Sequence, residues 1–382
     1  MTALAEAAPR SGWRDRLRDL RDALTAKPGF RSWAAGFPLT RLLARRRARE
    51  LFDLCAGFVY SQVLTACVRL RLFEILEDGP QEEAALARRL DLPPEGAARL
   101  LRAAESLRLV RQRADGRWSL GELGAATVGN PGIAAMVEHH AMLYADLADP
   151  VAILRRDRGG NALSRYWAYA GADSPGALPD ERVGDYTALM AASQPMVAEE
   201  VIAAYDFRRH RALMDIGGGS GAFLAAVAGA APELRVTLFD LPAVAEQGRA
   251  RFARMGLGAR ADAHGGDFTA DPLPTGADLI SLVRVTHDHD DDVVRALLAR
   301  VRAALPPGGR VIIAEPMAGT PGAEPMGEAY FGFYLLAMGS GRPRRPEELS
   351  AMLTDAGFTQ PRLIATRTPL LVRVMVADVS PR

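Results

Sequence analysis

A dense group of ionisable residues follows an apolar stretch in the second half of the chain. It comprises Arg284, His287, Asp288, His289, Asp290, Asp291 and Asp292. The preceding residues, Asp278–Val283, have the length and composition of a buried strand, and open α/β sheets bind ligands where such strands end. Imidazole titrates near neutral pH and can accept a proton from a reacting hydroxyl. We therefore predict that His287 is a general base.

The same residue types could instead bind a metal ion. Histidines and carboxylates are common ligands, but adjacent side chains cannot all converge on one ion. Asp290–Asp292 also fit the acidic first turn of a helix. The sequence therefore favours a site without metal.

A glycine-rich stretch, residues 215–221, follows an earlier apolar strand and opens an alanine-rich helix. Gly217 and Gly219 let the backbone turn sharply and approach a ligand, and the helix N-terminus adds free N–H groups. Together with Ala222, these glycines also fit the dinucleotide-binding pattern. Asp240 ends the next strand and is spaced to bind a ribose in either case. The stretch by itself therefore leaves two nucleoside ligands open.

Two features favour S-adenosylmethionine over a nicotinamide dinucleotide. Asp215, directly before the glycines, opposes a pyrophosphate but suits a ligand that carries an ammonium group and a sulfonium. Asp267 and Phe268 end a third strand, where a carboxylate can accept the adenine amino group and an aromatic ring can stack. Asp267 also fits a helix cap or a turn.

The elements that position these residues alternate between strands and helices from residue 207 to 382. Strands are expected at Ala212–Ile216, Arg235–Phe239, Asp278–Val283, Arg310–Ala314 and Pro361–Ile364. Such alternation predicts a parallel sheet covered on both faces, an α/β Rossmann-like domain. The last strand, Leu370–Val379, has no helix before it, so we expect it to be antiparallel.

The front half is predicted to be helical. Residues 1–47 form a basic segment whose helices break near Lys27–Gly29 and Phe37–Pro38. A helix from Ala48 to Leu76 is apolar on most faces, so a second subunit is expected to cover it. The pattern of residues 79–125 predicts a winged helix, and residues 48–130 are the expected dimerisation domain. A helical region, residues 131–206, leads into the catalytic domain.

The overall charge does not indicate a polyanionic partner, because the 382 residues carry a net charge of only +1. The first 50 residues carry +7 and the remainder −6. This N-terminal excess fits a solvated basic lead-in, or a segment of residues 10–50 that rests on anionic lipid. The second winged-helix helix, Pro94–Leu109, has mixed charge, which argues against DNA binding.

The compartment follows from the cysteines and the apolar runs. Cys55 and Cys67 are too few for a disulfide framework and fit a reducing, cytoplasmic setting. The longest uncharged apolar run, Leu54–Val68, is shorter than the ~18–20 residues that cross a bilayer. We therefore expect no membrane span.

The chain resembles the plant-type O-methyltransferase family over nearly its whole length. The motifs that carry the resemblance appear in order: Asp215-Ile-Gly-Gly-Gly-Ser-Gly, Phe239-Asp-Leu-Pro, Gly266-Asp-Phe, His287-Asp and Asp355-Ala-Gly-Phe. The resemblance implies an S-adenosylmethionine-dependent enzyme, an obligate homodimer paired through the winged helix, His287 as base and Glu315 as the carboxylate that orients it. It also assigns Leu241 and Arg284 to the donor site. A strand-end carboxylate in water remains the alternative for Glu315.

Two departures from the family pattern bear on the substrate. Plant enzymes have a lysine four residues before the base, where this chain has Val283, and a second glutamate near the base, where this chain has Pro343. A phenol substrate is therefore less expected. Residues 48–62 and 283–292 resemble the carotenoid-methylating branch of the family, which implies a tertiary hydroxyl on an acyclic carotenoid as the acceptor. The alternatives are a polyketide or phenol methyltransferase, and a winged-helix regulator with the donor site as a sensor.

Large flexible and aromatic side chains suit an apolar substrate. The candidates that line its pocket are Met190, Met317, Met326, Tyr330, Phe331, Phe333, Tyr334 and Met338. At helical spacing, part of this set is equally expected in the core. Glu138-His139-His140, a polar cluster in an apolar helix, fits a cap or a partner contact better than catalysis.

Overall fold

The computed structural model describes residues 12–155, 160–167 and 193–381. The chain forms two compact units, Met1–Ala125 and Ala126–Arg382. Helices α8 (Pro131–Asp146), α9 (Pro150–Arg155) and α10 (Ala162–Tyr166) belong to the second unit.

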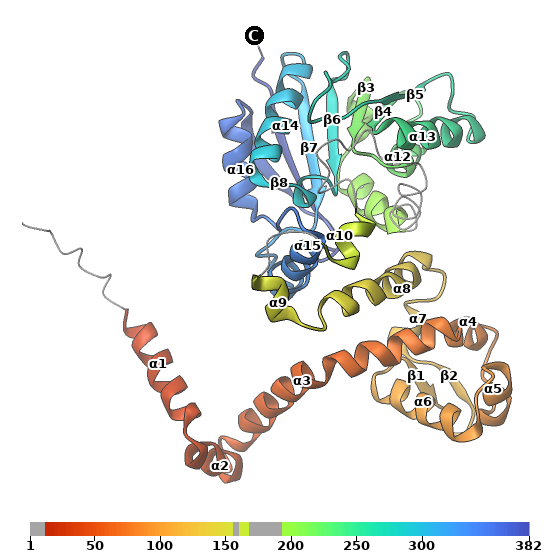
Figure 1. The fold of residues 1–382 in the computed structure, drawn as a ribbon, viewed down its shortest axis with the longest axis vertical. Helices are drawn as coiled ribbons and strands as arrows, with labels where there is room; N and C mark the ends of the chain where they lie inside the picture. Colours follow the sequence, from red (N-terminus) through yellow and green to blue (C-terminus); the bar gives the residue numbers. More distant parts are fainter. Residues whose placement is uncertain (1–11, 156–159, 168–192, 382) are drawn as a thin grey trace, which may run out of the picture. The chain divides into compact units, whose positions relative to one another are not determined.

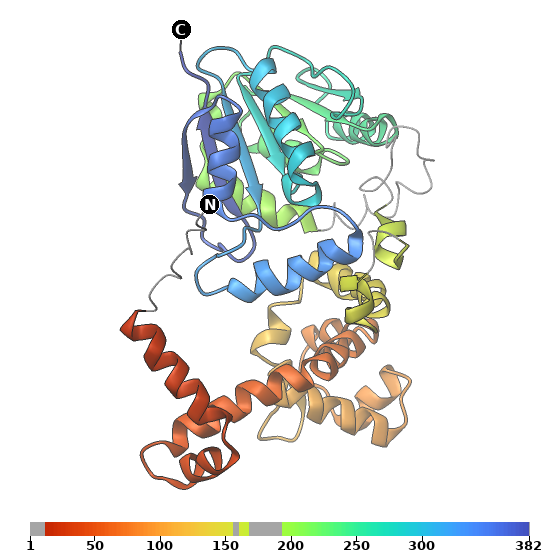
Figure 2. The same ribbon diagram turned by 60° about the vertical axis from the view of Figure 1, so that its left-hand side comes forward.

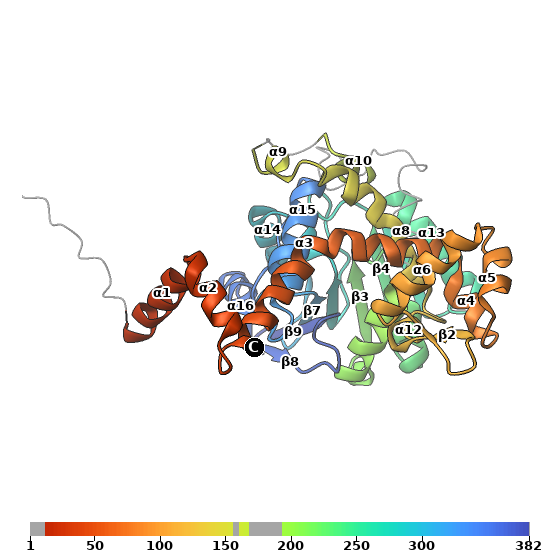
Figure 3. The same cartoon turned by 90° about the horizontal axis from the view of Figure 1, so that it is seen from below.

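A winged helix forms the C-terminal part of the first unit, as predicted (Figure 3). Its elements are α4 (Leu72–Glu77), α5 (Glu83–Arg89), α6 (Pro94–Ser106), β1 (Val110–Gln112), β2 (Trp118–Leu120) and α7 (Glu122–Ala125). The β1–β2 hairpin is antiparallel, with Val110 opposite Leu120. Trp118, the first residue of β2, is fully buried, and its Nε1 donates to Glu83 Oε2 at 3.2 Å.

The N-terminal helices are α1 (Trp13–Ala26), α2 (Pro28–Gly36) and α3 (Arg41–Arg69), with the two predicted breaks between them. The expected single helix from Ala48 to Leu76 is wrong. It ends at Arg69, because Arg71 adopts a left-handed conformation with φ 54°. This turn changes the direction of the chain before α4, and the apolar side chains of α4 are buried.

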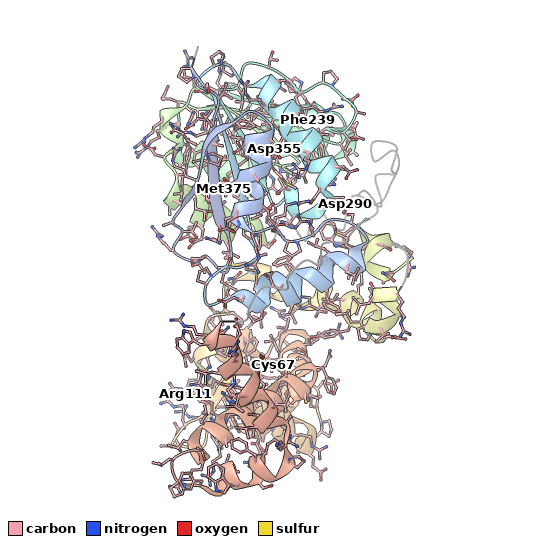
Figure 4. All side chains as sticks on the ribbon, turned by 90° about the vertical axis from the view of Figure 1, so that its left-hand side faces the viewer. Cys67, Arg111, Phe239, Asp290, Asp355 and Met375 are labelled. Atoms are coloured by element: carbon pink, nitrogen blue, oxygen red, sulfur yellow. The ribbon has the colours of Figure 1, made fainter. Side chains whose placement is uncertain are left out.

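Helix α3 is long and apolar enough, by length and composition alone, to cross a membrane. The uncharged run Leu54–Val68 covers only part of this helix, which extends beyond it on both sides. The C-terminal part of α3 nevertheless packs on α4 and α6 inside the first unit. Thr65 and Cys67 are buried there (Figure 4).

The second unit contains a seven-stranded sheet of order β5-β4-β3-β6-β7-β9-β8 (Figure 1). The strands are β3 (Ala212–Ile216), β4 (Arg235–Asp240), β5 (Ala261–Gly265), β6 (Leu279–Val283), β7 (Arg310–Glu315), β8 (Thr359–Ile364) and β9 (Arg373–Asp378). β9 runs antiparallel to both of its neighbours, β7 and β8, whereas β3 to β7 pair in parallel, which confirms the expected antiparallel final strand. The fold is therefore a Rossmann-like α/β sheet with an antiparallel strand inserted next to β7.

Helices cover both faces of this sheet. On one face, residues 193–204, α12 (Ala222–Ala230) and α13 (Pro242–Arg254) enclose one apolar cluster. On the other, α14 (Asp291–Ala304) and α16 (Pro346–Asp355) enclose a second, which contains Phe239 and Met375 (Figure 4). These two cores fix the strand ends that carry the polar residues.

A third apolar cluster joins α8, α9 and α10 to the segment after β7. That segment has a π-helical turn, η5 (Met326–Phe331), followed by α15 (Gly332–Met338). In Figure 2, α15 lies across the lower edge of the sheet, beside these helices.

Candidate active site

The polar residues gather where the strand order reverses. β3 lies between β4 and β6, and the carboxyl ends of these parallel strands open a crevice, the place where such sheets bind ligands. Gly217 follows β3, Asp240 ends β4, Glu315 ends β7, and the short turn η4 (Thr286–Asp288) follows β6.

The glycine loop after β3 is built for close approach. Gly217 and Gly219 have φ of 67° and 60°, in the left-handed region that favours glycine. A Cβ on Gly217 would lie 2.9 Å from Val285 Cγ2, whereas one on Gly219 would meet nothing within 4 Å. The loop therefore has open space above Gly219.

Two carboxylates, one fully buried and one partly buried, support this loop. Asp240 accepts from the backbone N–H of Gly219 at 2.8 Å and from that of Leu241 at 2.7 Å. Asp215 is fully buried; its Oδ1 accepts from Ser281 Oγ at 2.6 Å, and its Oδ2 has no hydrogen-bond partner among the described residues. Burial raises the pKa of each aspartate to about 7.

Open space above a glycine loop, with an unsatisfied buried carboxylate oxygen beneath it, fits a nucleoside ligand that carries positive charge. S-adenosylmethionine has that character.

The third strand end combines a turn with an aromatic contact. Asp267 Oδ1 accepts from the Thr269 backbone N–H at 2.8 Å and from its hydroxyl at 2.6 Å, which is the turn geometry that the sequence left open. The ring of Phe268 packs edge-on against His289, with centroids 5.2 Å apart. Adenine recognition by these two residues stays a prediction.

His287 lies buried between two carboxylates. Its Nε2 is 3.1 Å from Asp288 Oδ1, and its Nδ1 is 3.3 Å from Glu315 Oε2, within ion-pair reach but outside hydrogen-bond geometry. Glu315 is fully buried and also accepts from Thr286 Oγ1 at 2.6 Å and from the His287 backbone N–H at 3.1 Å. Glu315 is therefore a fixed acceptor beside the imidazole, not a carboxylate in water.

The two carboxylates set the charge of His287. Burial by itself lowers the imidazole pKa, but Asp288 and Glu315 together outweigh it and raise the pKa of His287 to about 9. No local pattern indicated that Asp288 would lie beside the second ring nitrogen. Asp288 supplies a carboxylate near His287 in a chain that has Pro343 where plant enzymes have glutamate.

A strap, residues 340–344, holds the turn that carries His287. Arg344 is fully buried and donates to the carbonyls of Thr286 at 2.6 Å and His289 at 2.8 Å. The backbone N–H of Arg342 donates to the His287 carbonyl at 3.0 Å. A Cβ on Gly341 would lie 2.1 Å from that same carbonyl oxygen, so only glycine permits this approach. Sequence reasoning missed the strap.

Arg284 leaves the end of β6 in a left-handed conformation, with φ 59°. Its guanidinium donates to Ser193 Oγ at 2.8 Å, in the helix at 193–204. This contact ties the turn after β6 to a helix that covers the sheet. A role for Arg284 in donor binding stays a prediction.

An aromatic face adjoins His287. The Phe331 ring centroid is 5.7 Å from that of His287, and the Tyr330 ring is 5.0 Å from Phe331. Both are only partly buried. Met326 and Phe333 are partly buried as well, whereas Met317 and Met338 are buried in core clusters, so these two pack the core. Met190 lies outside the described residues.

Two adjacent histidines of α8 secure this face. His139 Nε2 is 2.6 Å from the Tyr334 hydroxyl, which also accepts from Trp167 Nε1 at 2.8 Å. His140 Nε2 is 2.7 Å from the Tyr330 hydroxyl. The polar cluster in α8 therefore anchors the tyrosines of η5 and α15, a use that the sequence did not reveal.

Within the described ranges, no three His, Cys, Asp or Glu side chains group in a way that could hold a metal ion.

Comparison with known proteins gives the family. Residues 144–359 match the O-methyltransferase domain, and residues 52–129 match the O-methyltransferase dimerisation domain. The chain is 46% identical over 350 residues to the demethylspheroidene O-methyltransferase of Cereibacter sphaeroides, covering 91% of each chain. It is 45% identical to the protein of the same name from Rhodobacter capsulatus, over 89% of this chain and 84% of that one.

Solved structures agree with this match. Human N-acetylserotonin methyltransferase in complex with SAM superposes with a TM-score of 0.71 at 25% identity, covering 87% of this chain and 98% of that one. The S-adenosylmethionine-dependent methyltransferase SibL gives a TM-score of 0.73 at 26% identity, covering 87% and 99%. This chain therefore belongs to the O-methyltransferase family, and it is an S-adenosylmethionine-dependent O-methyltransferase.

Proposed function

We propose that the enzyme methylates the tertiary hydroxyl of an acyclic carotenoid. The observation that carries this proposal is the identity of 46% and 45% to two demethylspheroidene O-methyltransferases, over about nine-tenths of the chain. The aromatic face of Tyr330 and Phe331 beside His287 supports it, because a polyene needs a long apolar surface that ends at the reacting group.

The donor site uses the strand ends of β3 and β4. Asp240 would accept from the ribose hydroxyls, and Gly219 would let the ligand lie against the backbone. The buried charge of Asp215 would favour the positive charge of the donor. S-adenosylmethionine would supply a methyl group that its sulfonium activates, with the neutral thioether as the leaving group.

His287 performs the proton transfer in this proposal. A tertiary alcohol is a weak acid, so reaction depends on alignment and on a base that takes the proton as the oxygen attacks. The carboxylate of Glu315, 3.3 Å from Nδ1, favours the neutral tautomer that keeps its proton on Nδ1, which leaves Nε2 to accept the proton of the hydroxyl. Once Nε2 carries the proton, Asp288 stabilises the imidazolium.

The activity should rise with pH up to about 9. A base must be neutral to act, and the pKa of His287 is raised to about 9 by Asp288 and Glu315 against the effect of burial. Below that pH, kcat/KM should increase about tenfold per pH unit. Asp288→Asn removes the charge beside Nε2 and should move the rise to lower pH by roughly 1–3 pH units.

A pH profile of kcat/KM for both proteins measures this shift. Asp292→Asn, which neutralises an exposed aspartate in the first turn of α14, is the matched control and should leave the profile in place. An Asp288→Asn profile that coincides with the parent profile would refute the role of Asp288.

The substrate proposal can be tested in a host that makes 1-hydroxy acyclic carotenoids but lacks their methyltransferase. Expression of this chain should convert the extracted pigments to the methoxy form, and expression of His287→Ala should not. Unchanged pigments in a host that accumulates active enzyme would point to a polyketide or phenol as the acceptor.

We further propose a homodimer formed through the first unit. The supporting observations are the dimerisation domain match and an apolar face of α3 within it that no described residue covers. On that face Leu54 and Phe58 are 81% and 69% exposed, and Leu51, seven residues before Phe58, is exposed as well. A second copy would bury these side chains.

Phe58→Glu should therefore weaken the dimer, because a charge would enter an apolar interface. Sedimentation velocity should show a dimer for the parent and a concentration-dependent monomer for the variant. Met255→Glu, at an exposed apolar position of the second unit, should stay dimeric. A parent protein that sediments as a monomer would contradict this proposal.

The expected location is the cytoplasm, with the enzyme peripheral at the membrane that dissolves its substrate. Both cysteines are free thiols, and burial raises the pKa of Cys67 to about 12, which keeps it protonated. These features are consistent with a reducing compartment.

A further inference from the structure

The N-terminal helices carry a surface that methyl transfer and dimerisation leave unexplained. Helices α1 and α2 and the start of α3 precede the dimerisation domain match, which begins at residue 52. In α1, Trp13, Leu17 and Leu20 are 68%, 56% and 58% exposed, and α1 has no buried residue. Their spacing of four and three residues puts them on one face of the helix.

Exposed apolar side chains continue beyond α1, in α2 and at the start of α3. Trp33 stacks on Phe37 with ring centroids 5.0 Å apart, and both rings remain exposed. Leu39, Leu42 and Leu43 follow at the start of α3 and are exposed too. We call the exposed apolar side chains of residues 13–43 the N-terminal apolar surface. A soluble domain rarely leaves so many large apolar groups in water without a partner.

Positive charge surrounds this surface. Residues 12–50 hold eleven Arg and Lys side chains against four Asp and Glu, and all eleven are exposed. Four of the arginines, at 45, 46, 47 and 49, lie close together on α3. Two copies of this segment facing each other would repel, so pairing of the segment with itself would cover the surface poorly. Anionic lipid headgroups complement the charge, while the apolar side chains enter the acyl boundary.

We propose that residues 13–49 bind the surface of an anionic bilayer, with the N-terminal apolar surface inserted and the arginines at the headgroups. In α1, tryptophan and leucine share one face, arginines flank that face, and the aspartates lie on the opposite side, which is the arrangement of an interfacial helix. In Figures 1 and 3, α1 and α2 lie at the end of α3 opposite to α4–α6, so the winged helix does not cover them. The binding does not depend on methyl transfer, and it would bring the enzyme to a lipid-dissolved acceptor.

Vesicle flotation of the full-length protein tests this inference. Vesicles of equal parts phosphatidylglycerol and phosphatidylcholine should float with the protein, and vesicles of phosphatidylcholine alone should float with much less. High salt should weaken the binding because it screens the arginines. Leu17→Glu should lower the partition coefficient at least about tenfold, since it places a charge in the inserted face. Met255→Glu, the same charge change at an exposed position of the second unit, should bind like the parent.

Two further readouts separate the outcomes. Leu17→Glu should keep the parent affinity for S-adenosylhomocysteine by calorimetry, which shows that it is folded and that methyl-donor binding is independent of the surface. It should also keep the parent sedimentation coefficient. Equal flotation of parent and Leu17→Glu, or no preference for phosphatidylglycerol, would overturn the inference. Loss of dimerisation in Leu17→Glu with unchanged flotation would assign the surface to a second subunit instead.

Discussion

His287→Ala should lower turnover by roughly 10²–10⁴-fold, the usual contribution of a general base. The imidazole is buried beside an aromatic face, and Asp288 and Glu315 lie within ion-pair reach of its two ring nitrogens. Donor affinity should not change, because the proposed donor contacts come from β3 and β4. Single-turnover assays and calorimetry with S-adenosylhomocysteine measure the two quantities separately.

The matched control is His264→Ala. His264 lies on β5, is half-exposed and pairs with Asp262 at 3.1 Å, so its loss should leave turnover near the parent value. Glu315→Gln should reduce turnover less than His287→Ala, since glutamine keeps an oxygen for the Thr286 hydroxyl. Near-normal turnover in His287→Ala would assign proton removal to water or to another residue.

Asp240→Ala should weaken donor binding by about 1.5–3 kcal/mol, the usual range for a hydrogen bond to a charged group. The carboxylate also holds the backbone N–H groups of Gly219 and Leu241, so the glycine loop would lose its support at the same time. Calorimetry with S-adenosylhomocysteine gives the affinity. Asp262→Ala, a carboxylate on β5 that accepts from the N–H of Ala263, should bind as the parent does.

Gly219→Val tests the same donor site by steric obstruction, whereas Asp240→Ala tests it by removing a hydrogen-bond acceptor. A Cβ there meets no protein atom within 4 Å, so the side chain would fill only the space proposed for the donor. Gly256→Val is the control for backbone strain, because Gly256 has a similar φ of 69° and open surroundings but lies after α13. Unchanged affinity in both Asp240→Ala and Gly219→Val would remove the donor from this loop.

Local patterns predicted most of the fold. The strand at Ala212–Ile216 and the glycine loop after it are encoded by consecutive residues, since apolar runs and glycines act over a few positions. The antiparallel last strand was predictable because no helix precedes it. The winged-helix hairpin followed from its Asp-Gly turn.

Contacts between distant residues were not predictable. Arg344 and Gly341 reach the turn at His287 from more than 50 residues away, and His139 reaches Tyr334 from almost 200. No local pattern marks such partners, because tertiary packing alone brings them together. The break at Arg71 was missed for a related reason: a left-handed arginine is unfavourable in isolation and is compensated by burial of the apolar residues of α4.

The site residues were predictable only in part. The pattern of strands put Asp240 and Glu315 at strand ends, Asp215 near the end of β3 and His287 just after β6, and strand ends converge in an open sheet, while the roles of these residues stay predictions. It could not show that Asp288 faces Nε2, since an aspartate next to a histidine equally fits a helix start. Nor could it separate lining residues from core: Met317 is in the core and Phe331 beside the base, although both are apolar residues after the same strand.

Methyl transfer from labelled S-adenosylmethionine to a 1-hydroxy acyclic carotenoid, with catechol as the competing acceptor, tests the proposed activity most directly. The purified enzyme should label the carotenoid at its terminal oxygen and leave catechol nearly unlabelled, and His287→Ala should label neither. Labelling of catechol alone would contradict the carotenoid assignment while leaving the enzyme an O-methyltransferase.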